Sequence, residues 1–570
     1  EQKLNFITEG LRFKALASFK NWSSTTNSAS AGWNKYHLQD FSVDDNGVYS
    51  FVTRLQNESG GEVSTDLKPG VANSGDRRFY FQAIMDYNRT FGKHDVNAMF
   101  IYNQDELVTQ LFSGDLIAAL PKRKQGVAAR LSYAYDGKYL AEVNMGYNGS
   151  ENFAKGHRWG FFPSIAVGYN ISEEAFFEPL KNVFSNMKIR ASWGLVGNDN
   201  IGGARFVYMP TINLTGTGYT TGLDGDITYK GPVYSRYGNP EVTWEVGKKV
   251  NVGLDLQLFN SLNLTMDYFH ETRTDIFQER GTIPQYLGTA GTKVFGNLAA
   301  MKNQGFDFAA DFNKKIGKDW FISFKGTFTY AHNEITKYDE SPKYAFQSKV
   351  GQSANIPSIM ISDGLFKDPD DVKNSNQQIG GNLSAGDIKY VNISKLYGYD
   401  DDIVDISDWV WAKNPTVPEI VYGFGPSIRW KNLDFSFFFQ GVAKVSLVMS
   451  DFHPFGDNSL RNVLTWIADD RWSPDNQNIN ATYPRLTRDT SVNNTQRSDY
   501  WLRNAAFIKL KNAEIGYTYK NMRFYVSGMN LATFSPFKHW DPEQGGGNGL
   551  KYPTQRVFNF GFQMTINNNR

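Results

Sequence analysis

Apolar and polar side chains alternate along much of this chain, most clearly between residues 250 and 270. Apolar residues occupy the even positions from 250 to 258, residues 260–261 interrupt the pattern, and the even positions from 262 to 268 are apolar again. Successive side chains of a β-strand point to opposite faces of the sheet. The pattern therefore predicts a β-hairpin with one apolar face.

The same unit recurs elsewhere. Residues 127–135 and 139–147 alternate in the same way, and Asp136-Gly137 between them supplies the positive φ angles that a tight hairpin turn needs. Further hairpins are predicted to join 306–312 to 320–330 and 422–430 to 435–439, and single strands are predicted at 187–195, 513–519, 524–528 and 558–566.

The lengths of these strands and of their connections favour a membrane. Strands of about nine or ten residues exceed the usual length in globular sheets and match a tilted bilayer crossing. Tight turns alternate with long polar segments around 208–245, 332–420 and 445–500. We therefore predict an all-β fold, a large antiparallel transmembrane β-barrel with short periplasmic turns and long extracellular loops. On pattern alone, a soluble sandwich or propeller stays open.

Composition excludes several classes of protein and of binding site. The chain has 570 residues and a mean hydropathy of -0.46, without any run of eighteen apolar residues, which excludes transmembrane helices but not lipid-facing strands. Its 59 Lys and Arg balance 58 Asp and Glu, so no basic surface for nucleic acid is expected. Cysteine is absent, which excludes disulfides and thiolate metal sites.

Motifs for catalysis are missing as well. The sequence contains no Walker loop, GxSxG elbow, HExxH helix or dinucleotide fingerprint, and its 7 histidines are not spaced as metal ligands. We predict that the chain is not an enzyme, has no catalytic residues and requires no cofactor.

Short segments in a fixed order carry a family resemblance. They are GYNGSENF at 146–153, RASWG at 190–194, NPEVTWE at 239–245, NQGF at 303–306, NPTVP at 414–418, FFFQG at 437–441, RWSP at 471–474 and YPR at 483–485. Their order and spacing resemble those of the SusC/RagA-like TonB-dependent outer-membrane transporters of Bacteroidota.

The resemblance implies an organisation. Such a barrel has 22 strands, and residues 1–570 would form its carboxy-terminal part with about 16–18 of them, the plug domain and the amino-terminal strands lying outside this chain. The implied location is the outer membrane, in contact with its lipid.

The resemblance also implies a function, TonB-dependent active import of bulky nutrients, either glycans or oligopeptides, with substrate-binding residues unknown. The implied partners are a SusD-like surface lipoprotein that acts as a lid and the TonB–ExbB–ExbD complex, reached through the missing amino-terminal region, in a dimer of transporter–lid pairs. Two alternatives stay open: a non-transporting scaffold barrel in a surface or secretion assembly, and a soluble glycan-binding module.

One acidic segment suggests a metal. Members of the family often carry a loop here that resembles an EF-hand, and in this sequence Asp401, Asp405 and Asp408 align with its ligand positions, which predicts a structural Ca²⁺ site. Asp402 replaces the glycine of the sharp turn, and the first ligands are displaced to around Asn392. The alternative is a solvated acidic loop that runs from Asp400.

Two further groups of residues have predicted roles. Charged residues at positions expected to face the barrel lumen should form polar ladders: Arg130, Arg190, Asp255, Asp307 and Arg429. Tryptophans of the long segments could stack on sugar rings or hold peptides, although packing among the loops is favoured: Trp409, Trp411, Trp466, Trp472 and Trp540. The strand at 558–566 is expected to pair with a strand from outside this chain.

Overall fold

The computed structural model describes the chain except for residues 57–60, 110–116, 118–119, 203, 285, 287–291, 400, 451–463, 488–490 and 567–570. One antiparallel sheet of 17 strands dominates it, and each strand pairs with the next one along the meander. The strands are β1 (Gln2–Lys3), β2 (Leu11–Ser30), β5 (Lys68–Phe91), β6 (His94–Thr109), β7 (Lys122–Tyr135), β8 (Tyr139–Ser150), β9 (Trp159–Asn170), β10 (Phe184–Asn198), β13 (Glu245–Leu258), β14 (Leu262–Glu279), β15 (Phe295–Ile316), β16 (Trp320–Lys337), β21 (Ile420–Trp430), β22 (Leu433–Ala443), β25 (Phe507–Tyr519), β26 (Met522–Phe534) and β27 (Val557–Met564).

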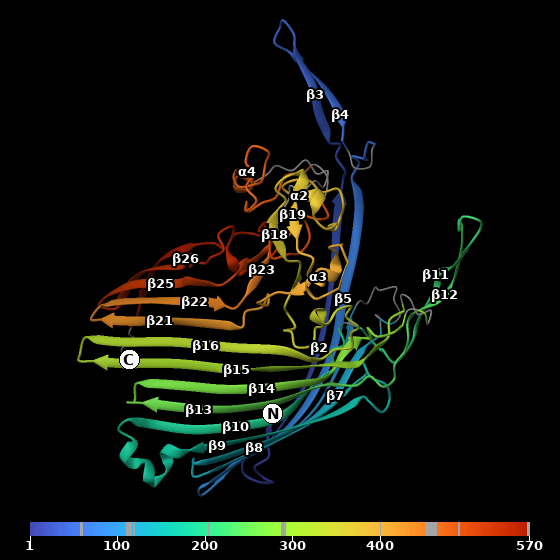
Figure 1. Cartoon of the computed structure of the whole chain (residues 1–570). Coiled ribbons are helices and arrows are strands. Elements are labelled where there is room, and N and C mark those ends of the chain that lie inside the picture. Colours follow the sequence, from blue (N-terminus) through green and yellow to red (C-terminus); the bar gives the residue numbers. More distant parts are fainter. Residues whose placement is uncertain are drawn as a thin grey trace.

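The turns divide between the two ends of the sheet as predicted. Tight turns join β7 to β8, β13 to β14 and β15 to β16 at one end, and the long connections lie at the other end (Figure 1). Asp136 and Gly137 adopt φ angles of 54° and 67°, which places Tyr135 opposite Tyr139. The predicted turn chemistry is therefore confirmed, and it sets the register of this hairpin.

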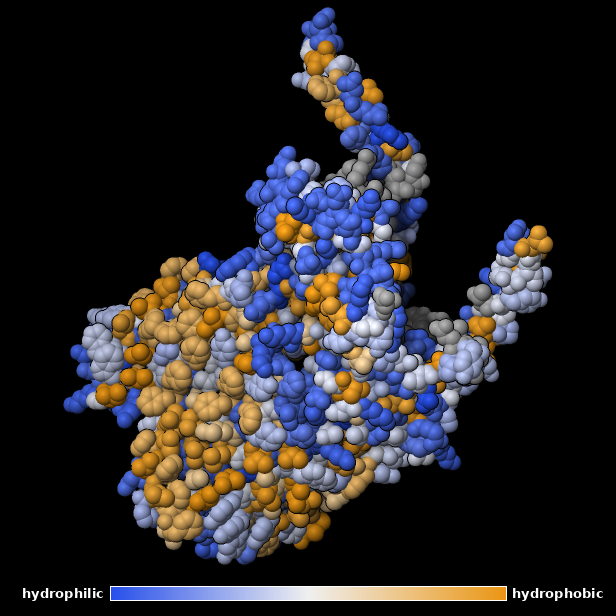
Figure 2. All heavy atoms as spheres, in the orientation of Figure 1, coloured by the Kyte–Doolittle hydropathy of each residue, from blue (hydrophilic) through white to orange (hydrophobic). Residues whose placement is uncertain are grey.

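The outer face of the sheet is apolar. On β8, Val143 and Met145 are 42% and 48% exposed, whereas Glu142 and Asn144 between them point to the other face and are partly buried. Figure 2 shows hydrophobic side chains spread over the outer surface of the strands, and hydrophilic ones over the loops. This arrangement is inverted relative to a water-soluble protein, as expected where lipid is the outer solvent.

Many strands are longer than the nine or ten residues expected, and the two longest near the amino terminus, β2 and β5, are not among the strands that the sequence predicted. β2 has 20 residues and β5 has 24, because their pairing continues past the apolar segment to Ser30 opposite Lys68. Beyond the membrane both faces of a strand pair contact water, so apolar and polar side chains no longer alternate. The end of such a strand therefore leaves no signal in the sequence. Two hairpins project further, β3 (Tyr36–Val43) with β4 (Tyr49–Leu55), and β11 (Thr211–Thr221) with β12 (Ile227–Arg236) (Figure 1).

Three of the long connections fold together at the mouth of the sheet. We call the described parts of residues 338–419, 444–506 and 535–556 the crown. It contains β17 (Ser358–Ile359), β18 (Ser362–Leu365), β19 (Ile388–Tyr390), β20 (Val410–Trp411), β23 (Ser446–Val448), β24 (Leu502–Asn504), α2 (Pro369–Asn374), α3 (Ile393–Leu396), α4 (Thr465–Asp469), η4 (Ala345–Gln347), η5 (Ile406–Asp408) and η6 (Pro542–Gln544). Among the described residues, the short helices η1 (Ile171–Glu173) and η2 (Ala175–Leu180) lie at the opposite end of the sheet (Figure 1).

The sheet has two edges within the described residues. β27 pairs with β26 alone. Along the edge of β2 that faces away from β5, only Arg12 and Phe13 are paired, and their partner is β1. The predicted partner of 558–566 therefore stays a prediction. In the part of the chain that the structure describes, no helix is long and apolar enough to cross a membrane.

Candidate functional site

The inner face of the sheet carries a network of charges centred on Arg190. Its Nε lies 3.1 Å from Oδ2 of Asp255, and its Nη2 lies 2.6 Å from Oδ2 of Asp267, so one guanidinium joins β10, β13 and β14. Gly253 makes room for it, since a Cβ there would lie 2.5 Å from Cζ of Arg190. The predicted ladder is confirmed at Arg190 and Asp255, with Asp267 as a partner that the sequence did not single out.

The other predicted ladder residues also contact neighbouring strands. Arg130 donates to Oδ1 of Asn97 at 3.3 Å, Thr329 donates to Oδ1 of Asp307 at 2.7 Å, and Arg429 lies over the ring of Phe321. Sequence reasoning missed two similar groups: Arg273 with Glu245 and Glu271, and Arg523 with Asp434 and Glu514. The charges of the second group alternate with apolar residues, a signal that could have identified them, whereas Glu271 and Arg273 lie among polar residues.

The crown has a hydrophobic core of its own. Tyr483 is fully buried at its centre and meets Trp501 edge to face at 5.4 Å. Burial raises the pKa of Tyr483 above its ordinary value. The core draws on all three crown segments: Met360, Leu365, Ile388, Tyr390, Val404, Val445, Leu447, Met449, Ile467, Trp472, Ala481, Tyr483, Trp501, Ala505 and Phe537.

The tryptophans of the long segments take part in this packing. Trp472 belongs to the buried core, and Trp409, Trp466 and Trp540 pack against it. Trp411 donates from Nε1 to the carbonyl oxygen of Ser348 at 2.8 Å. The packing interpretation of these five side chains is therefore confirmed.

A buried carboxylate ties two crown segments together. Asp387 is 1% exposed and accepts from Nε and Nη2 of Arg485 at 2.7 and 3.0 Å, from Nδ2 of Asn494 at 2.7 Å and from the backbone N–H of Ser384 at 2.8 Å. Both oxygens are thus satisfied, as a buried charge requires. Arg485 is the last residue of the YPR segment quoted above.

A buried lysine holds the third crown segment. The side chain of Lys509 on β25 is 1% exposed, and its Nζ lies 2.7 Å from Asp541 and 2.5 Å from Glu543. Burial alone would raise the pKa of Asp541, but the hydrogen bonds from Lys509 and from the backbone N–H of Glu543, together with the charge of Lys509, lower it on balance. The segment between β26 and β27 is therefore pinned to the sheet by charge.

We expect Lys509→Ala to loosen residues 535–556 by about 2 kcal/mol, because it leaves the partly buried Asp541 without its cation and removes the shorter of the two lysine contacts of Glu543. Hydrogen exchange of that segment is the measurement. Lys511→Ala is the matched control, because Lys511 is more exposed and contacts Glu543 alone, at 3.2 Å. Equal protection in both variants would contradict the assignment. Because folding lowers the pKa of Asp541, its contribution should be present at neutral pH and be lost as the pH falls through that lowered pKa.

The structure gives the three predicted calcium ligands local partners. Asp408 accepts from the backbone N–H groups of Ser394 and Asp405 at 2.8 and 2.9 Å, and Asp405 accepts from that of Ser407 at 2.6 Å. Oδ1 of Asp401 accepts from the hydroxyl of Ser394 at 2.8 Å. Asp405 and Asp408 thus cap short helices, Asp401 and Asp408 both accept from Ser394, and among the described residues no group of three acidic or histidine side chains is arranged to hold a metal ion. Asp400 lies outside them.

Comparisons with known proteins define the family. Residues 5–531 match the family described as "TonB dependent receptor-like, beta-barrel", and the chain belongs to this family. It is 25% identical to TonB-dependent receptor P3 of Formosa agariphila over 88% of this chain and 54% of that protein. It is 27% identical to TonB-dependent receptor SusC of Bacteroides thetaiotaomicron over 76% of this chain and 43% of that protein.

Solved structures agree with the fold. The structure of the RagAB peptide transporter matches with a TM-score of 0.69 at 20% identity, over 98% of this chain and 60% of that one. Its "open-open" state matches with a TM-score of 0.70. The resemblance to SusC/RagA-like proteins is thus confirmed, and the protein is an outer-membrane β-barrel of a family of transporters, not of enzymes. The chain spans about half the length of the curated relatives it matches.

Proposed function

We propose that this chain forms the wall and the extracellular mouth of a TonB-dependent importer of bulky nutrients, glycans or oligopeptides. The observation that carries the proposal is the crown, a packed structure with a buried core at the mouth of a sheet whose inner face is charged. A barrel of this many strands encloses space that its own side chains do not fill. A wide polar passage beneath an ordered mouth suits a large hydrophilic cargo.

The resemblance extends the proposal to partners. A SusD-like lipoprotein would close over the crown as a lid, and the TonB–ExbB–ExbD complex would act through the amino-terminal region of the full-length protein. Because the crown has its own core, it offers the lid a stiff surface. RagAB is described as a peptide transporter, which supports oligopeptides as one of the two cargo classes. A dimer of transporter–lid pairs is part of the same proposal.

Uptake by cells of the native host tests this function. Deletion of the full-length gene should abolish uptake of labelled oligosaccharides or oligopeptides, and a protonophore should have the same effect on the wild type, since energy must reach TonB from the inner membrane. Affinity purification of the full-length protein should recover a surface lipoprotein. Unchanged uptake together with loss of a surface or secretion assembly would favour the scaffold alternative.

We also propose that Ca²⁺ binds the loop of Asp401, Asp405 and Asp408 after a local rearrangement. Removal of Ca²⁺ with a chelator should then speed proteolysis of residues 392–408 severalfold, because unneutralised carboxylates repel one another. The measurement is the cleavage rate of the full-length protein with and without chelator. Asp402→Ala serves as control, since Asp402 is paired with Lys395 at the surface. Identical rates would favour a capped acidic loop without metal.

A further inference from the structure

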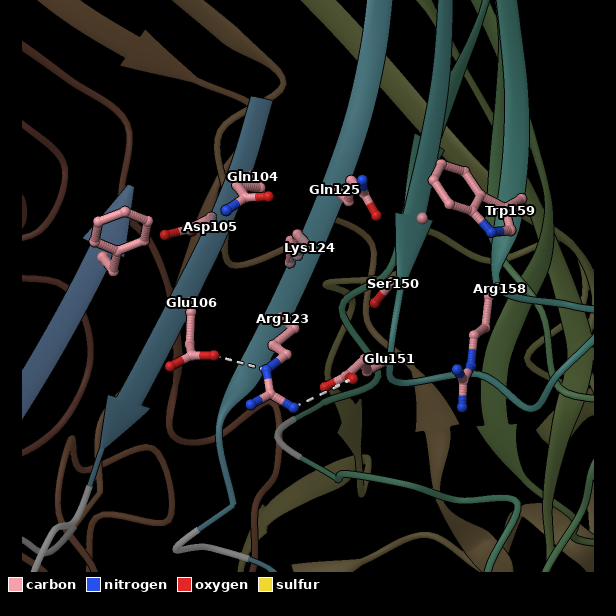
Figure 3. A pocket seen from close by; sticks show the side chains of 12 residues that line it. Gln104, Asp105, Glu106, Arg123, Lys124, Gln125, Ser150, Glu151, Arg158 and Trp159 are labelled. Atoms are coloured by element: carbon pink, nitrogen blue, oxygen red, sulfur yellow. Dashed lines mark hydrogen bonds and ion pairs between the residues drawn. The ribbon is translucent and has the colours of Figure 1, made fainter. Parts of the chain in front are cut away.

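A pocket of about 440 Å³ is formed by strands β5 to β9, beside the extracellular ends of β6, β7, β8 and β9 (Figure 3). It is lined by Phe79, Gln104, Asp105, Glu106, Arg123, Lys124, Gln125, Gly149, Ser150, Glu151, Arg158 and Trp159. We call it the rim pocket. It is separate from the lumen network and from the crown, and nothing in the proposed import function uses it.

The rim pocket belongs to the lipid-facing side of the sheet. On β7, Arg123 and Gln125 share their face with Leu131, which is 52% exposed on the apolar outer surface. Across the register, Glu106 stands opposite Arg123 and Gln104 stands opposite Gln125, so these four side chains point the same way. Asp105 and Lys124 alternate with them and pair on the inner side, with Arg78 and Asp199.

Its height places the rim pocket at the lipid headgroups. From Tyr135 at the periplasmic turn, β7 runs ten residues to Gln125 and twelve to Arg123. At about 3.4 Å per residue and a tilt of about 40°, these positions lie roughly 26 and 31 Å above the turn. The apolar band of such a barrel is about 25 Å tall. Gln125 therefore marks its outer boundary, and Arg123 lies among the headgroups.

The lining combines an aromatic face with hydrogen-bonding groups. One side of the Trp159 indole covers Gly149, where a Cβ would come within 3.0 Å of the ring, and the indole stacks on Tyr147 at 4.8 Å. Trp159 remains 43% exposed. Gln125 donates to the hydroxyl of Tyr102 at 2.8 Å, and that hydroxyl donates to Gln104 at 3.0 Å. Amide groups are thus presented in a fixed orientation.

Charges complete the lining. Arg123 lies between two carboxylates, 2.7 Å from Glu106 and 3.9 Å from Glu151 (Figure 3). Arg158 donates from Nε to the carbonyl oxygen of Phe153 at 3.1 Å, and among the described residues its guanidinium has no carboxylate partner. A guanidinium of this kind suits a phosphate, and the carboxylates and amides suit hydroxyl groups.

We propose that the rim pocket binds the phosphorylated sugar headgroup of an outer-leaflet glycolipid of the lipid A type. The exposed indole of Trp159 packs on the apolar face of a sugar ring, Glu106, Glu151 and the amides bind its hydroxyls, and Arg158 binds its phosphate. The acyl chains continue down the apolar wall below, past Val127 and Leu131. A headgroup is the occupant that reaches this site, because the pocket adjoins the lipid-facing surface at headgroup height.

Lipid binding to the full-length protein tests the proposal. The protein is reconstituted in phosphatidylethanolamine nanodiscs that contain a trace of lipid A, and bound lipid is counted by native mass spectrometry. Trp159→Ala should lower lipid A occupancy roughly fivefold, the loss of one good aromatic contact. Arg158→Ala should lower it by a similar factor for lipid A, and should change nothing for dephosphorylated lipid A.

Trp320→Ala is the matched control, because Trp320 is also 43% exposed on the outer face and stacks on Trp430, but lies at the periplasmic end. It should leave occupancy unchanged, and heat-modifiable gel migration should confirm that all variants are folded. Equal occupancy in all variants, no preference for lipid A over phosphatidylethanolamine, or pairing of two copies through this face in place of lipid would each overturn the proposal.

Discussion

Replacing Arg485 with alanine is expected to open the crown at a cost of about 3–5 kcal/mol, because it leaves a buried carboxylate without its cation. Asp387 is 1% exposed, and Arg485 supplies two of its hydrogen bonds. Asn494 and the backbone of Ser384 cannot neutralise it. Native-state hydrogen exchange of the full-length protein is the measurement, since it reports local opening while the sheet stays folded.

Two variants frame this result. Arg485→Lys keeps the positive charge but loses the bidentate hydrogen bonding to Asp387, and should destabilise the crown by a smaller amount. Lys395→Ala removes a crown ion pair in which Asp402 is 79% exposed, and should cost at most about 1 kcal/mol. If Arg485→Ala and Lys395→Ala gave the same protection, the buried pair would not be what holds the two segments together. Loss of cargo uptake in Arg485→Ala alone would connect the crown to the proposed import.

Placing arginine at Leu254 is expected to destabilise the folded barrel by about 2–4 kcal/mol, because the side chain would point into the lipid core. Leu254 pairs with Met266, about five residues from the turn at Phe259 and Asn260, which puts it roughly 13 Å above the periplasmic boundary. Leu256 lies closer to the turn, so arginine there should cost less. Equilibrium unfolding in urea after reconstitution into lipid vesicles measures both.

The control lies on the same strand and faces the other way. Asn251→Arg places the same charge on the inner face, where it stays hydrated, and should change stability by less than about 1 kcal/mol. Spin labels at Leu254 and Met266 should be accessible to oxygen in the bilayer, and a label at Gln257 should be accessible to a water-soluble relaxation agent. The reverse pattern of accessibility would invert the assignment of faces and rule out the barrel as described.

Local patterns in the sequence determined the class of the fold. The period of two assigned each side chain of a hairpin to the lipid or to the lumen, and Asp136-Gly137 fixed a turn, because both depend only on residues adjacent in the chain. The same information could not give strand length. In β2 the pairing continues through a polar stretch to Ser30, where no apolar face is left to mark it.

Tertiary structure decided which side chains meet. Asp387 and Arg485 are 98 residues apart, and Arg190 and Asp267 are 77 apart, so their pairing follows from the register of whole strands and from packing among loops. The sequence could place Arg190 in the lumen without naming its second partner. The crown tryptophans could not be told from ligand-binding ones by pattern, because only packing distinguishes a buried indole from an exposed one.

The acidic loop and the rim pocket illustrate the same limit. Asp401, Asp405 and Asp408 are close in sequence, yet Asp405 and Asp408 accept from backbone N–H groups of short helices, and Asp401 accepts from the hydroxyl of Ser394. The rim pocket draws on strands from Phe79 to Trp159, and its level in the membrane depends on strand tilt. Periodicity and turn chemistry depend on neighbouring residues and can be recognised in one sequence. The contact partners of a side chain and its depth in the membrane are set only when distant strands align, because the residues of one strand do not specify which strand lies beside it.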